Sequence, residues 1–458
     1  MKVRSNLVEN RRVAILGMAR SGMAAARLLR HYGASVFVSE LKSQAAVSAQ
    51  VESLQKAGIE CETGGHTFRA LEDVDFVVLS PGIAPTIPIV KEVRRRQLPL
   101  FSEIEVTSWL CPATIVAITG SNGKSTTTAL MAHILNEAGH KAVATGNIGS
   151  PFADDVLTLG EQDYAVVEVS SFQLELIDTF KPQAATILNI TPDHLDRYGD
   201  YTTYIQSKYR IADEQDESDY LILNADDPHL TNPRLEGSPT RLHFSTKQET
   251  APGVWVKDDH LVFTFSDRSG TICPVAEIGI PGPHNLANSA AAAALSLSLG
   301  INTGAIARGL ASFGGIPHRL EFVTEVDGVR WVNDSKATNV DSVNYALQSI
   351  NAPIILIMGG RDKGGDFSTL SQLVAAKVKL LLLIGEAGEL IGKALGETTQ
   401  VLEAGQLVKA LELAQGQAKA GDTVLLSPGC ASFDQFRDFE ERGEIFKQTV
   451  KELTGGHR

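Results

Sequence analysis

The sequence is poor in cysteine and has no long hydrophobic run. Its 458 residues include four cysteines that are far apart and form no C-x-x-C pair, namely Cys61, Cys111, Cys273 and Cys430. This spacing argues against a zinc knuckle and against a disulfide framework. We expect all four to be buried small hydrophobic residues. No apolar stretch is long enough to span a membrane, so no membrane insertion is expected.

A targeting segment and an excess of basic charge are also absent. The N-terminal stretch "MKVRSNLVENRRVAILG" lacks the apolar core and the small-residue cleavage site of a signal peptide, which predicts a cytoplasmic protein. The 54 acidic residues outnumber the 41 basic ones, and the formal net charge is -13. This balance opposes loose association with nucleic acid or anionic lipid. No nucleic-acid partner is therefore expected. We also predict a monomer.

The length and the order of apolar segments predict several α/β domains. A chain of 458 residues is too long for one hydrophobic core. Short apolar runs alternate with helical patterns, as in βαβ units, and this alternation restarts twice. We predict a Rossmann-like N-terminal unit over residues 1–110 and a central P-loop-type mononucleotide-binding ATPase domain over 111–315. A Rossmann-like C-terminal domain is expected over 316–458.

The first block opens with a strand, a glycine turn and a helix. The strand "RRVAILG" leads through "MARSG" into "MAAARLLRHYG", and the glycines Gly17 and Gly22 form a pattern one residue away from the dinucleotide fingerprint. Two interpretations stay open. The turn either needs glycine for close packing or binds an anion at the helix N-terminus. Further strands are expected at "ASVFVSE", "DFVVLS" and "PLFS".

The second and third blocks repeat the strand and helix pattern. Strands are expected at "TIVAIT", "YAVVEVS", "AATILNI" and "DYLILN", followed by a β-rich region around "GVWVKDDHLVFTF" and the helix "NLANSAAAAALSLSLG". The third block has strands at "RWVND", "PIILIMGG", "VKLLLLIG" and "DTVLLS". Its order again predicts a doubly wound sheet.

The segment "AITGSNGKSTTTAL" has the features of a phosphate-binding loop. A strand ends at Thr119, and residues 120–126 lead into a helix with one apolar face. The N-terminus of such a helix favours anions, Lys124 adds a full positive charge, and Ser125 is placed to hold magnesium. The usual P-loop has its first glycine two positions earlier, where this chain has Ile118, so this loop is shorter.

Two charged residues elsewhere in this block are candidates for metal binding. Glu168 ends the strand "YAVVE", so its carboxylate should lie at the same sheet edge as the loop, although such a glutamate is more often exposed. Lys208 follows Tyr201, Tyr204 and Ile205 by seven, four and three positions, which places it on the apolar face of a helix. It either extends its amine to water or is buried. A buried neutral lysine can become a carbamate that binds magnesium.

The short loop resembles the ATP loop of the Mur ligase family, which adds amino acids to the UDP-muramoyl peptide precursor, and of its folylpolyglutamate synthase relatives. Similar motifs follow in order along all three blocks: "TGNIGSP", "VVEVSSFQLE", "NITPDHLDRYGDYTTYIQSK", "GPHNLANSAAA", "GIPHRLE", "VNDSKATN" and "SPGCASFDQFRDFEERG". The wording of "SSFQLE", "NDSKATN" and "SPGCASFDQF" is similar to the family branch that adds D-glutamate.

The resemblance implies ATP-dependent ligation of D-glutamate to UDP-N-acetylmuramoyl-L-alanine through an acyl phosphate. ATP and two magnesium ions are the expected co-substrate and cofactor. The alternatives are another Mur-type amino-acid ligase, an enzyme like folylpolyglutamate synthase, or an ATP-dependent sensor without ligase chemistry. The folylpolyglutamate enzymes generally lack the N-terminal Rossmann-like unit, and the L-alanine enzyme usually has a histidine where this loop has Asn122.

The resemblance also implies roles for individual residues. Lys124, His194 and Lys208 are expected at the catalytic centre, with Ser125, Glu168, His194 and the carbamate of Lys208 around the metal ions. The ATP contacts implied are Gly120, Ser121, Asn122, Gly123, Lys124, Ser125, Thr126, Asn288, Arg319 and Asp334.

The two other substrates have their own implied residues. The UDP-muramoyl substrate is expected at Arg20, Ser21, Asn147, Ser170, Ser171 and Gln173. D-glutamate is expected at Lys336, Thr338, Lys363, Ser432, Phe433 and Phe439, with Arg442 nearby. The chain departs from some relatives in "VFVSELK", where an Asp-Thr-Arg-like run is replaced by Ser39, Glu40 and Leu41. This departure leaves the uracil contacts undefined.

Overall fold

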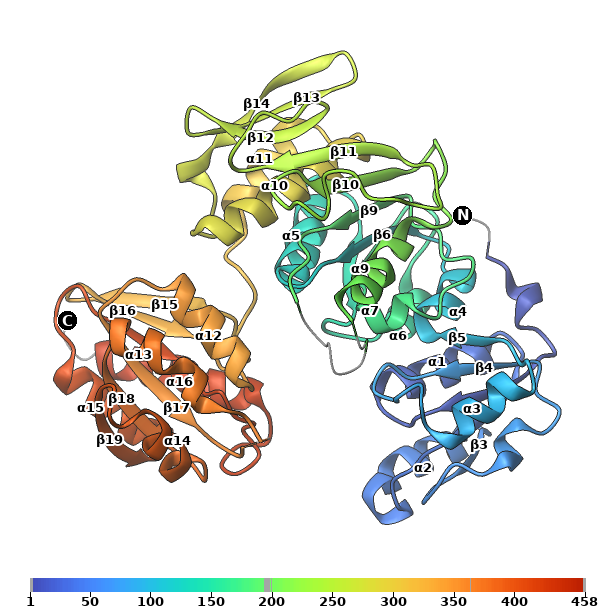
Figure 1. Cartoon of the computed structure of the whole chain (residues 1–458), viewed down its shortest axis with the longest axis horizontal. Coiled ribbons are helices and arrows are strands. Elements are labelled where there is room, and N and C mark those ends of the chain that lie inside the picture. Colours follow the sequence, from blue (N-terminus) through green and yellow to red (C-terminus); the bar gives the residue numbers. More distant parts are fainter. Residues whose placement is uncertain (1–2, 193–197, 199, 363, 456–458) are drawn as a thin grey trace. The chain divides into compact units, whose positions relative to one another are not determined.

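The computed structural model describes residues 3–192, 198, 200–362 and 364–455, and it shows three β-sheets flanked by helices (Figure 1). The chain divides into two compact units, Met1–Phe313 and Gly314–Arg458. The first unit holds a five-stranded and a nine-stranded sheet, and the second holds a six-stranded sheet.

The N-terminal sheet is parallel, with the strand order β3-β2-β1-β4-β5. Its strands are β1 (Arg12–Leu16), β2 (Ser35–Ser39), β3 (Glu60–Glu62), β4 (Phe76–Leu79) and β5 (Leu100–Ser102). The helices are α1 (Arg20–His31), α2 (Ser48–Lys56), α3 (Pro88–Arg95) and α4 (Glu103–Leu110), with 3₁₀ turns at η1 (Ser5–Leu7), η2 (Gln44–Val47) and η3 (Phe68–Leu71).

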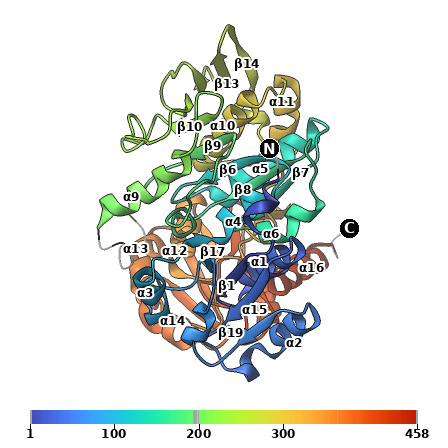
Figure 2. The ribbon, with the colours of Figure 1, turned by 90° about the vertical axis from the view of Figure 1, so that its right-hand side faces the viewer.

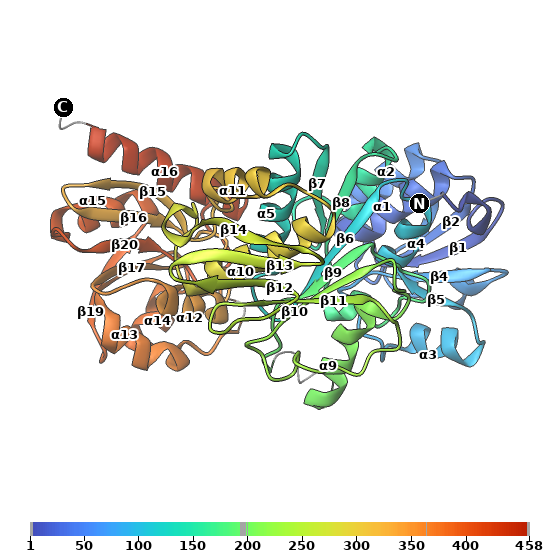
Figure 3. The ribbon, with the colours of Figure 1, turned by 90° about the horizontal axis from the view of Figure 1, so that it is seen from above.

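Alternate residues of β1 pack on opposite faces of this sheet. Val13 and Ile15 join a cluster with α1 and α2, whereas Ala14 and Leu16 pack with the apolar side of α3. A strand covered on both faces reads as a continuous hydrophobic run, as "RVAIL" does. Figure 3 shows α1 and α2 on one side of the sheet and α3 on the other.

The central sheet has the order β14-β13-β12-β11-β10-β9-β6-β8-β7 and is parallel from β7 to β12. Figure 2 shows β6 and β8 side by side, with β7 beyond β8. The parallel strands are β6 (Thr114–Thr119), β7 (Ala142–Gly146), β8 (Tyr164–Glu168), β9 (Ala184–Ile187), β10 (Tyr220–Asn224), β11 (Thr240–Ser245) and β12 (Gly253–Lys257). An antiparallel extension follows in β13 (His260–Phe265) and β14 (Arg268–Pro274).

Helices cover the central sheet on both faces, with α5 and α11 on one side and α9 on the other in Figure 3. They are α5 (Lys124–Glu137), α6 (Phe152–Asp155), α7 (Ser171–Leu174), α9 (Tyr201–Tyr209), α10 (Pro283–Ser298) and α11 (Thr303–Ser312). Short 3₁₀ turns lie at η4 (Val156–Thr158), η5 (Arg210–Ala212) and η6 (Val275–Glu277).

The two sheets of the first unit share a hydrophobic core. One buried cluster includes Ile15 of β1, Trp109 of α4, Phe152 of α6 and Tyr204 of α9. Polar links cross the same boundary, because Arg27 of α1 pairs with Asp154 of α6 at 2.7 Å. The N-terminal and central sheets therefore form one compact unit.

The second unit is a separate doubly wound domain with the order β15-β16-β20-β17-β18-β19. Its strands are β15 (Glu321–Val326), β16 (Val329–Asn333), β17 (Ile354–Gly359), β18 (Val378–Ile384), β19 (Gln400–Gly405) and β20 (Thr423–Leu426). Its helices are α12 (Val340–Ser349), α13 (Ser371–Lys377), α14 (Gly388–Leu395), α15 (Leu407–Gln417) and α16 (Phe439–Gly455), with η7 at Phe367–Leu370.

The strand β17 shows why both faces of this sheet need helices. Leu356 and Met358 join the cluster that includes α12, α13 and α14, whereas Ile355 and Ile357 pack with α15 and α16. The two groups of helices lie on opposite sides of the sheet in Figure 3. All strands of the sheet are parallel except β15, which pairs antiparallel with β16.

The predicted three-domain α/β architecture is confirmed, and one burial prediction is wrong. Cys111, Cys273 and Cys430 are buried as expected, but Cys61 is only partly buried because β3 is the edge strand of its sheet. The boundaries predicted at residues 110 and 315 stay predictions. Within the described residues, no helix combines the length and apolar composition that a bilayer span requires.

Candidate active site

The glycine loop links β6 to α5 at the carboxyl edge of the central sheet. Gly120 and Gly123 have φ angles of 152° and 84°, in the region that favours glycine. A Cβ on Gly123 would lie 2.3 Å from Oδ1 of Asn288 in α10. The fold therefore brings the predicted adenine contact against the predicted phosphate loop, although 165 residues separate them.

Lys124 is the first residue of α5, and its side chain folds over the loop. The ammonium group donates hydrogen bonds to the carbonyls of Gly120 and Ser121, at 2.9 Å each. The positive end of the helix dipole and a full positive charge therefore meet at the loop, which is the arrangement that binds phosphate groups. Ser125 follows in the first turn and is 9% exposed.

A second loop at the same edge holds the glycine loop in place. Asn189 follows β9, its amide oxygen accepts a hydrogen bond from the Asn122 amide at 2.8 Å, and its carbonyl accepts one from the Ser121 amide at 2.9 Å. Asn189 is not among the residues predicted from the sequence. Its position after an apolar strand, where polar residues of parallel sheets gather, was the available signal.

Glu168 ends β8 beside this loop, as predicted. The strands β6 and β8 pair in parallel with Ile118 opposite Glu168, and the Glu168 side chain is 2% exposed. Its Oε1 accepts a hydrogen bond from Nδ2 of Asn147 at 3.1 Å. No donor among the described residues reaches Oε2, which is also buried. A buried carboxylate oxygen without a donor at a phosphate-loop edge fits a metal cation.

Lys208 is buried rather than extended to water. It is 2% exposed, its Nζ donates a hydrogen bond to the Gly120 carbonyl at 2.9 Å, and it lies 4.7 Å from the centre of the Tyr204 ring. The Tyr204 hydroxyl is 2.9 Å from Oγ of Ser121. One face of α9 therefore packs on the loop, and Lys208 lies on the apolar face of this helix, as the spacing predicted.

The predicted metal ligands lie only partly within the described residues. His194 lies outside them, and the described part of the chain holds no cluster of three or more His, Cys, Asp or Glu side chains. Two of the predicted metal ligands among the described residues are Glu168, at the end of β8, and Ser125, in the first turn of α5.

The residues predicted for the UDP-muramoyl substrate occupy neighbouring loops of the first unit. Asn147 follows β7 and contacts Glu168 through both its backbone and its side chain. Arg20 begins α1 and donates a hydrogen bond to the Gly149 carbonyl, which links the N-terminal turn to the Asn147 loop. Ser21 follows Arg20, and Ser170, Ser171 and Gln173 form a turn directly after β8.

The first glycine turn is tightly packed. A Cβ on Gly22 would lie 2.1 Å from the carbonyl oxygen of Gly17, and one on Gly17 would lie 2.8 Å from Oγ of Ser80. These contacts require glycine for steric reasons. The packing interpretation of this turn is therefore sufficient, and the anion interpretation stays a prediction.

The second unit contains the predicted contacts Arg319 and Asp334. Asp334 follows β16 and is 5% exposed. It accepts hydrogen bonds from the Leu320 amide at 3.1 Å and the Ser427 hydroxyl at 2.8 Å. Burial raises the pKa of Asp334 to about 7. Arg319 lies between His318 and Leu320, whose φ angles of 64° and 45° are unusual for residues with side chains.

Most residues predicted for D-glutamate also lie in this unit's described part. The Lys336 ammonium is 5.9 Å from the centre of the Phe439 ring, Ser432 is buried, and Phe433 is 63% exposed. Thr338 precedes α12, and Lys363 lies outside the described residues. Arg442 is fully buried and donates hydrogen bonds to Ser335 and to the Cys430 carbonyl. It therefore links the segment after β16 to the segment after β20.

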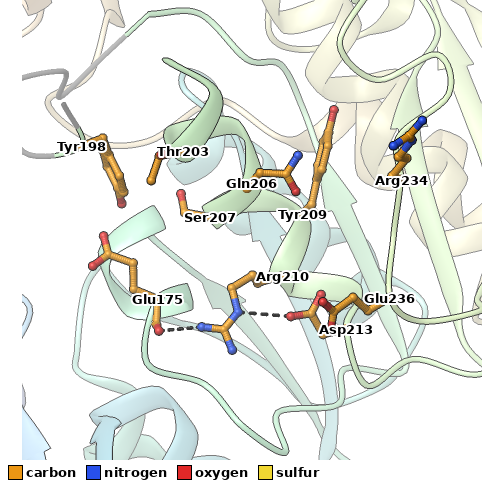
Figure 4. A pocket seen from close by; sticks show the side chains of 10 residues that line it. All are labelled: Glu175, Tyr198, Thr203, Gln206, Ser207, Tyr209, Arg210, Asp213, Arg234 and Glu236. Atoms are coloured by element: carbon orange, nitrogen blue, oxygen red, sulfur yellow. Dashed lines mark hydrogen bonds and ion pairs between the residues drawn. The ribbon is translucent and has the colours of Figure 1, made fainter. Parts of the chain in front are cut away.

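A cavity of about 640 Å³ lies on another face of α9 (Figure 4). Arg210 in its wall donates to Asp213 at 3.1 Å and to the Glu175 carbonyl. The described lining residues are Glu175, Tyr198, Thr203, Gln206, Ser207, Tyr209, Arg210, Asp213, Arg234 and Glu236. None of these described residues is a predicted site residue. Lys208 belongs to the same helix but projects from a different face.

Three family models match consecutive parts of the chain. The MurD-like N-terminal domain matches residues 11–102, the Mur ligase middle domain matches 118–296, and the Mur ligase glutamate ligase domain matches 318–430. A relative from Chloroherpeton thalassium is 44% identical, with 97% of this chain and 99% of the relative aligned. The chain belongs to the Mur ligase family.

Two of the relatives carry the same protein name. The Chloroherpeton relative and one from Salinibacter ruber, 43% identical over 97% of this chain and 99% of its own, are both named UDP-N-acetylmuramoylalanine--D-glutamate ligase. Among solved structures, Acinetobacter baumannii MurF matches with a TM-score of 0.59 at 17% identity, covering 97% of this chain and 93% of its own.

Thermotoga maritima UDP-N-acetylmuramate-alanine ligase MurC matches with a TM-score of 0.57 at 18% identity, covering 97% of this chain and all of its own. At such identities these structures support the Mur ligase fold alone. The predicted family and fold are therefore confirmed.

Proposed function

We propose that the chain ligates D-glutamate to UDP-N-acetylmuramoyl-L-alanine, converting ATP to ADP and phosphate in a cytoplasmic step of peptidoglycan precursor synthesis. The observation that carries this proposal is the 44% identity, over 97% of the chain, to a relative named for this reaction. The site geometry agrees with it, because a lysine-bearing glycine loop lies beside the buried carboxylate of Glu168.

The chemistry requires a carboxylate to be activated before an amine can attack it. Transfer of the γ-phosphoryl group from ATP converts the acceptor carboxylate to an acyl phosphate, and the D-glutamate amine then displaces phosphate through a tetrahedral intermediate. Negative charge accumulates during phosphoryl transfer, so positive charge must be held where it develops. We assign this task to Lys124 and the N-terminus of α5.

We further propose that two magnesium ions bind at this edge. Ser125, Glu168, His194 and a carbamate on Lys208 are the proposed ligands. The donor-free Oε2 of Glu168 supports cation binding. Bound magnesium supplies additional positive charge to the phosphate oxygens. Asn147 orients the Glu168 carboxylate by donating to its other oxygen.

The second unit is proposed to supply the amino-acid site. D-glutamate carries two carboxylates, which Lys336 and Lys363 would neutralise, while Thr338, Ser432, Phe433 and Phe439 would complete the pocket. Arg319 and Asp334 are proposed to contact ATP phosphate and ribose, and Asn288 its adenine. The protein is proposed to act as a monomer on small molecules.

An amino-acid panel with UDP-N-acetylmuramoyl-L-alanine and ATP tests the function, with product mass as the readout. D-glutamate should give the ligated product, and L-glutamate, L-alanine, L-lysine and diaminopimelate should not. Phosphate release that requires both the acceptor and D-glutamate would agree with ligation. ATP hydrolysis that ignores both substrates would instead identify a nucleotide-dependent sensor.

A further inference from the structure

Glu103 is a buried acid that no sequence motif singled out. It is the first residue of α4, on the connection between the N-terminal and central sheets, and is 3% exposed. Burial raises the pKa of its carboxyl to about 7. In either protonation state its Oε1 can accept a hydrogen bond.

The partner of Glu103 is Gln173, one of the residues predicted for the muramoyl substrate. Nε2 of Gln173 donates to Oε1 of Glu103 at 2.6 Å, and Gln173 is 1% exposed. On its other side, Oε1 of Gln173 accepts from the Ser170 amide and the Ser170 hydroxyl, at 2.8 Å each. Both ends of the buried amide are therefore satisfied.

The orientation of this amide follows from its neighbours. The Ser170 amide is a fixed donor, so Gln173 must present its oxygen to it, and the Gln173 nitrogen then needs an acceptor on the opposite side. Glu103 supplies that acceptor. Without it, the buried Gln173 nitrogen would lose its acceptor, or the amide would rotate and face the Ser170 N–H with its own.

The position of Ser170 makes this orientation relevant to the substrate. Ser170 follows Glu168 by two residues and is only half-buried. Its hydroxyl hydrogen is directed to the side-chain oxygen of Gln173, and its oxygen accepts from the backbone N–H of Gln173 at 3.3 Å. An oxygen has a second lone pair, so Ser170 presents an acceptor to a donor group of a bound molecule.

We infer that Glu103 is a positioning residue for the UDP-muramoyl substrate, acting through Gln173 to fix the Ser170 turn as a hydrogen-bond acceptor. The inference rests on the proposed function. Glu103 is not itself a predicted substrate contact. Its effect reaches the acceptor substrate through two consecutive hydrogen bonds, from Gln173 to Glu103 and from Ser170 to Gln173. ATP binding, at the loop on β6, lies outside this chain of contacts.

Steady-state kinetics of the full chain test the inference, with ATP and UDP-N-acetylmuramoyl-L-alanine varied separately. Glu103→Met keeps the length of the side chain but removes its oxygen acceptors. It should raise KM for the muramoyl substrate about tenfold or more, and KM for ATP less than about twofold. Glu103→Gln retains an acceptor oxygen and should stay within about threefold of the wild type. Glu103→Leu replaces Glu103→Met if that variant does not fold.

Glu105 provides a matched control on the same helix. It is fully buried and accepts from the Thr179 amide, the Thr179 hydroxyl and the Trp109 indole, without contacting Gln173. Glu105→Met should lower the melting temperature but leave KM for the muramoyl substrate unchanged. An equal KM shift in this control, or a wild-type KM in folded Glu103→Met, would overturn the inference. A wild type that ligates no D-glutamate would overturn the proposed function as well.

Discussion

Oδ1 of Asn288 in α10 lies directly against Gly123 in the glycine loop, because a Cβ added to Gly123 would be 2.3 Å from it. The contact joins the alanine-rich helix to the loop between β6 and α5. It explains why residue 123 must be glycine on two counts, the left-handed φ of 84° and the absence of space.

Gly123→Ala should therefore weaken ATP binding and destabilise the protein. Strain and the clash with Asn288 together should lower the free energy of unfolding by roughly 1–3 kcal/mol and raise KM for ATP about tenfold. Gly139→Ala is the matched control at the other end of α5, where φ is 88° but no atom lies within 4 Å of the added Cβ. It should lose stability only, and an equal effect on KM for ATP would contradict the explanation.

Lys124→Met should abolish most ligation without unfolding the protein. The substitution keeps the aliphatic stem but removes the charge above the Gly120 and Ser121 carbonyls, and we expect kcat/KM to fall roughly 100-fold or more. Lys141→Met removes the ion pair with Asp163 and the hydrogen bond to the Thr158 carbonyl, both next to the amino end of β7, and should retain activity. Unchanged turnover in the Lys124 variant would refute a phosphate role for the loop.

Some of this site could be predicted from the sequence because the necessary information is local. The turn at residues 120–126 carries its own glycines and lysine, and the spacing of Tyr201, Tyr204 and Lys208 correctly predicted the buried face of α9. Continuous apolar runs such as "RVAIL" likewise identified strands covered on both faces.

The parts that could not be predicted depend on contacts between distant residues. Glu103 and Gln173 are separated by 70 positions, and nothing near either one indicates the other. The edge strands β3 and β19 are partly exposed, so they lack the apolar run that identified central strands. The burial of Arg442 likewise results from its packing against Ser335 and Cys430.

Lys208 should carry a carbamate in the active protein. Its Nζ is buried beside the Gly120 carbonyl, close to the predicted metal site, and a carbamate formed from the neutral amine would place an anionic ligand there. Native mass spectrometry should find a mass increase equal to one CO₂ that is absent from Lys208→Met. An active preparation with unmodified Lys208 would contradict this prediction.

The buried carboxyl of Asp334 should make stability depend on pH. Because burial raises its pKa in the folded state to about 7, the folded protein binds a proton more tightly than the unfolded chain. Stability from this group is fully present below its unfolded pKa of about 4 and is lost as pH rises to about 7. The total change in the free energy of unfolding is on the order of 4 kcal/mol.

Asp334→Asn should remove this slope, since an amide does not titrate. Its oxygen can still accept from the Leu320 amide, and the Ser427 hydroxyl can accept from its nitrogen. Urea unfolding of wild type and variant at several pH values between 4 and 8 gives the difference directly. A difference that does not change with pH would show that Asp334 has an ordinary pKa.

Glu168→Gln should separate activity from stability. The variant keeps the volume of the side chain and the hydrogen bond from Asn147, but it removes a buried negative charge whose Oε2 has no donor among the described residues. Without divalent cations we expect an equal or higher melting temperature, because burying an uncompensated carboxylate is unfavourable.

The same substitution should reduce the ligation rate roughly 100-fold. Without the Glu168 carboxylate the proposed magnesium ion would bind less well, and the negative charge that develops during phosphoryl transfer would be less stabilised. The decisive measurement is the melting temperature with and without magnesium and ATP. Wild type should gain more stability from the pair than Glu168→Gln does, since only a ligand that binds the folded state raises the melting temperature. Equal gains in both proteins would place the metal away from Glu168, and the carboxylate would then have a structural role in holding Asn147.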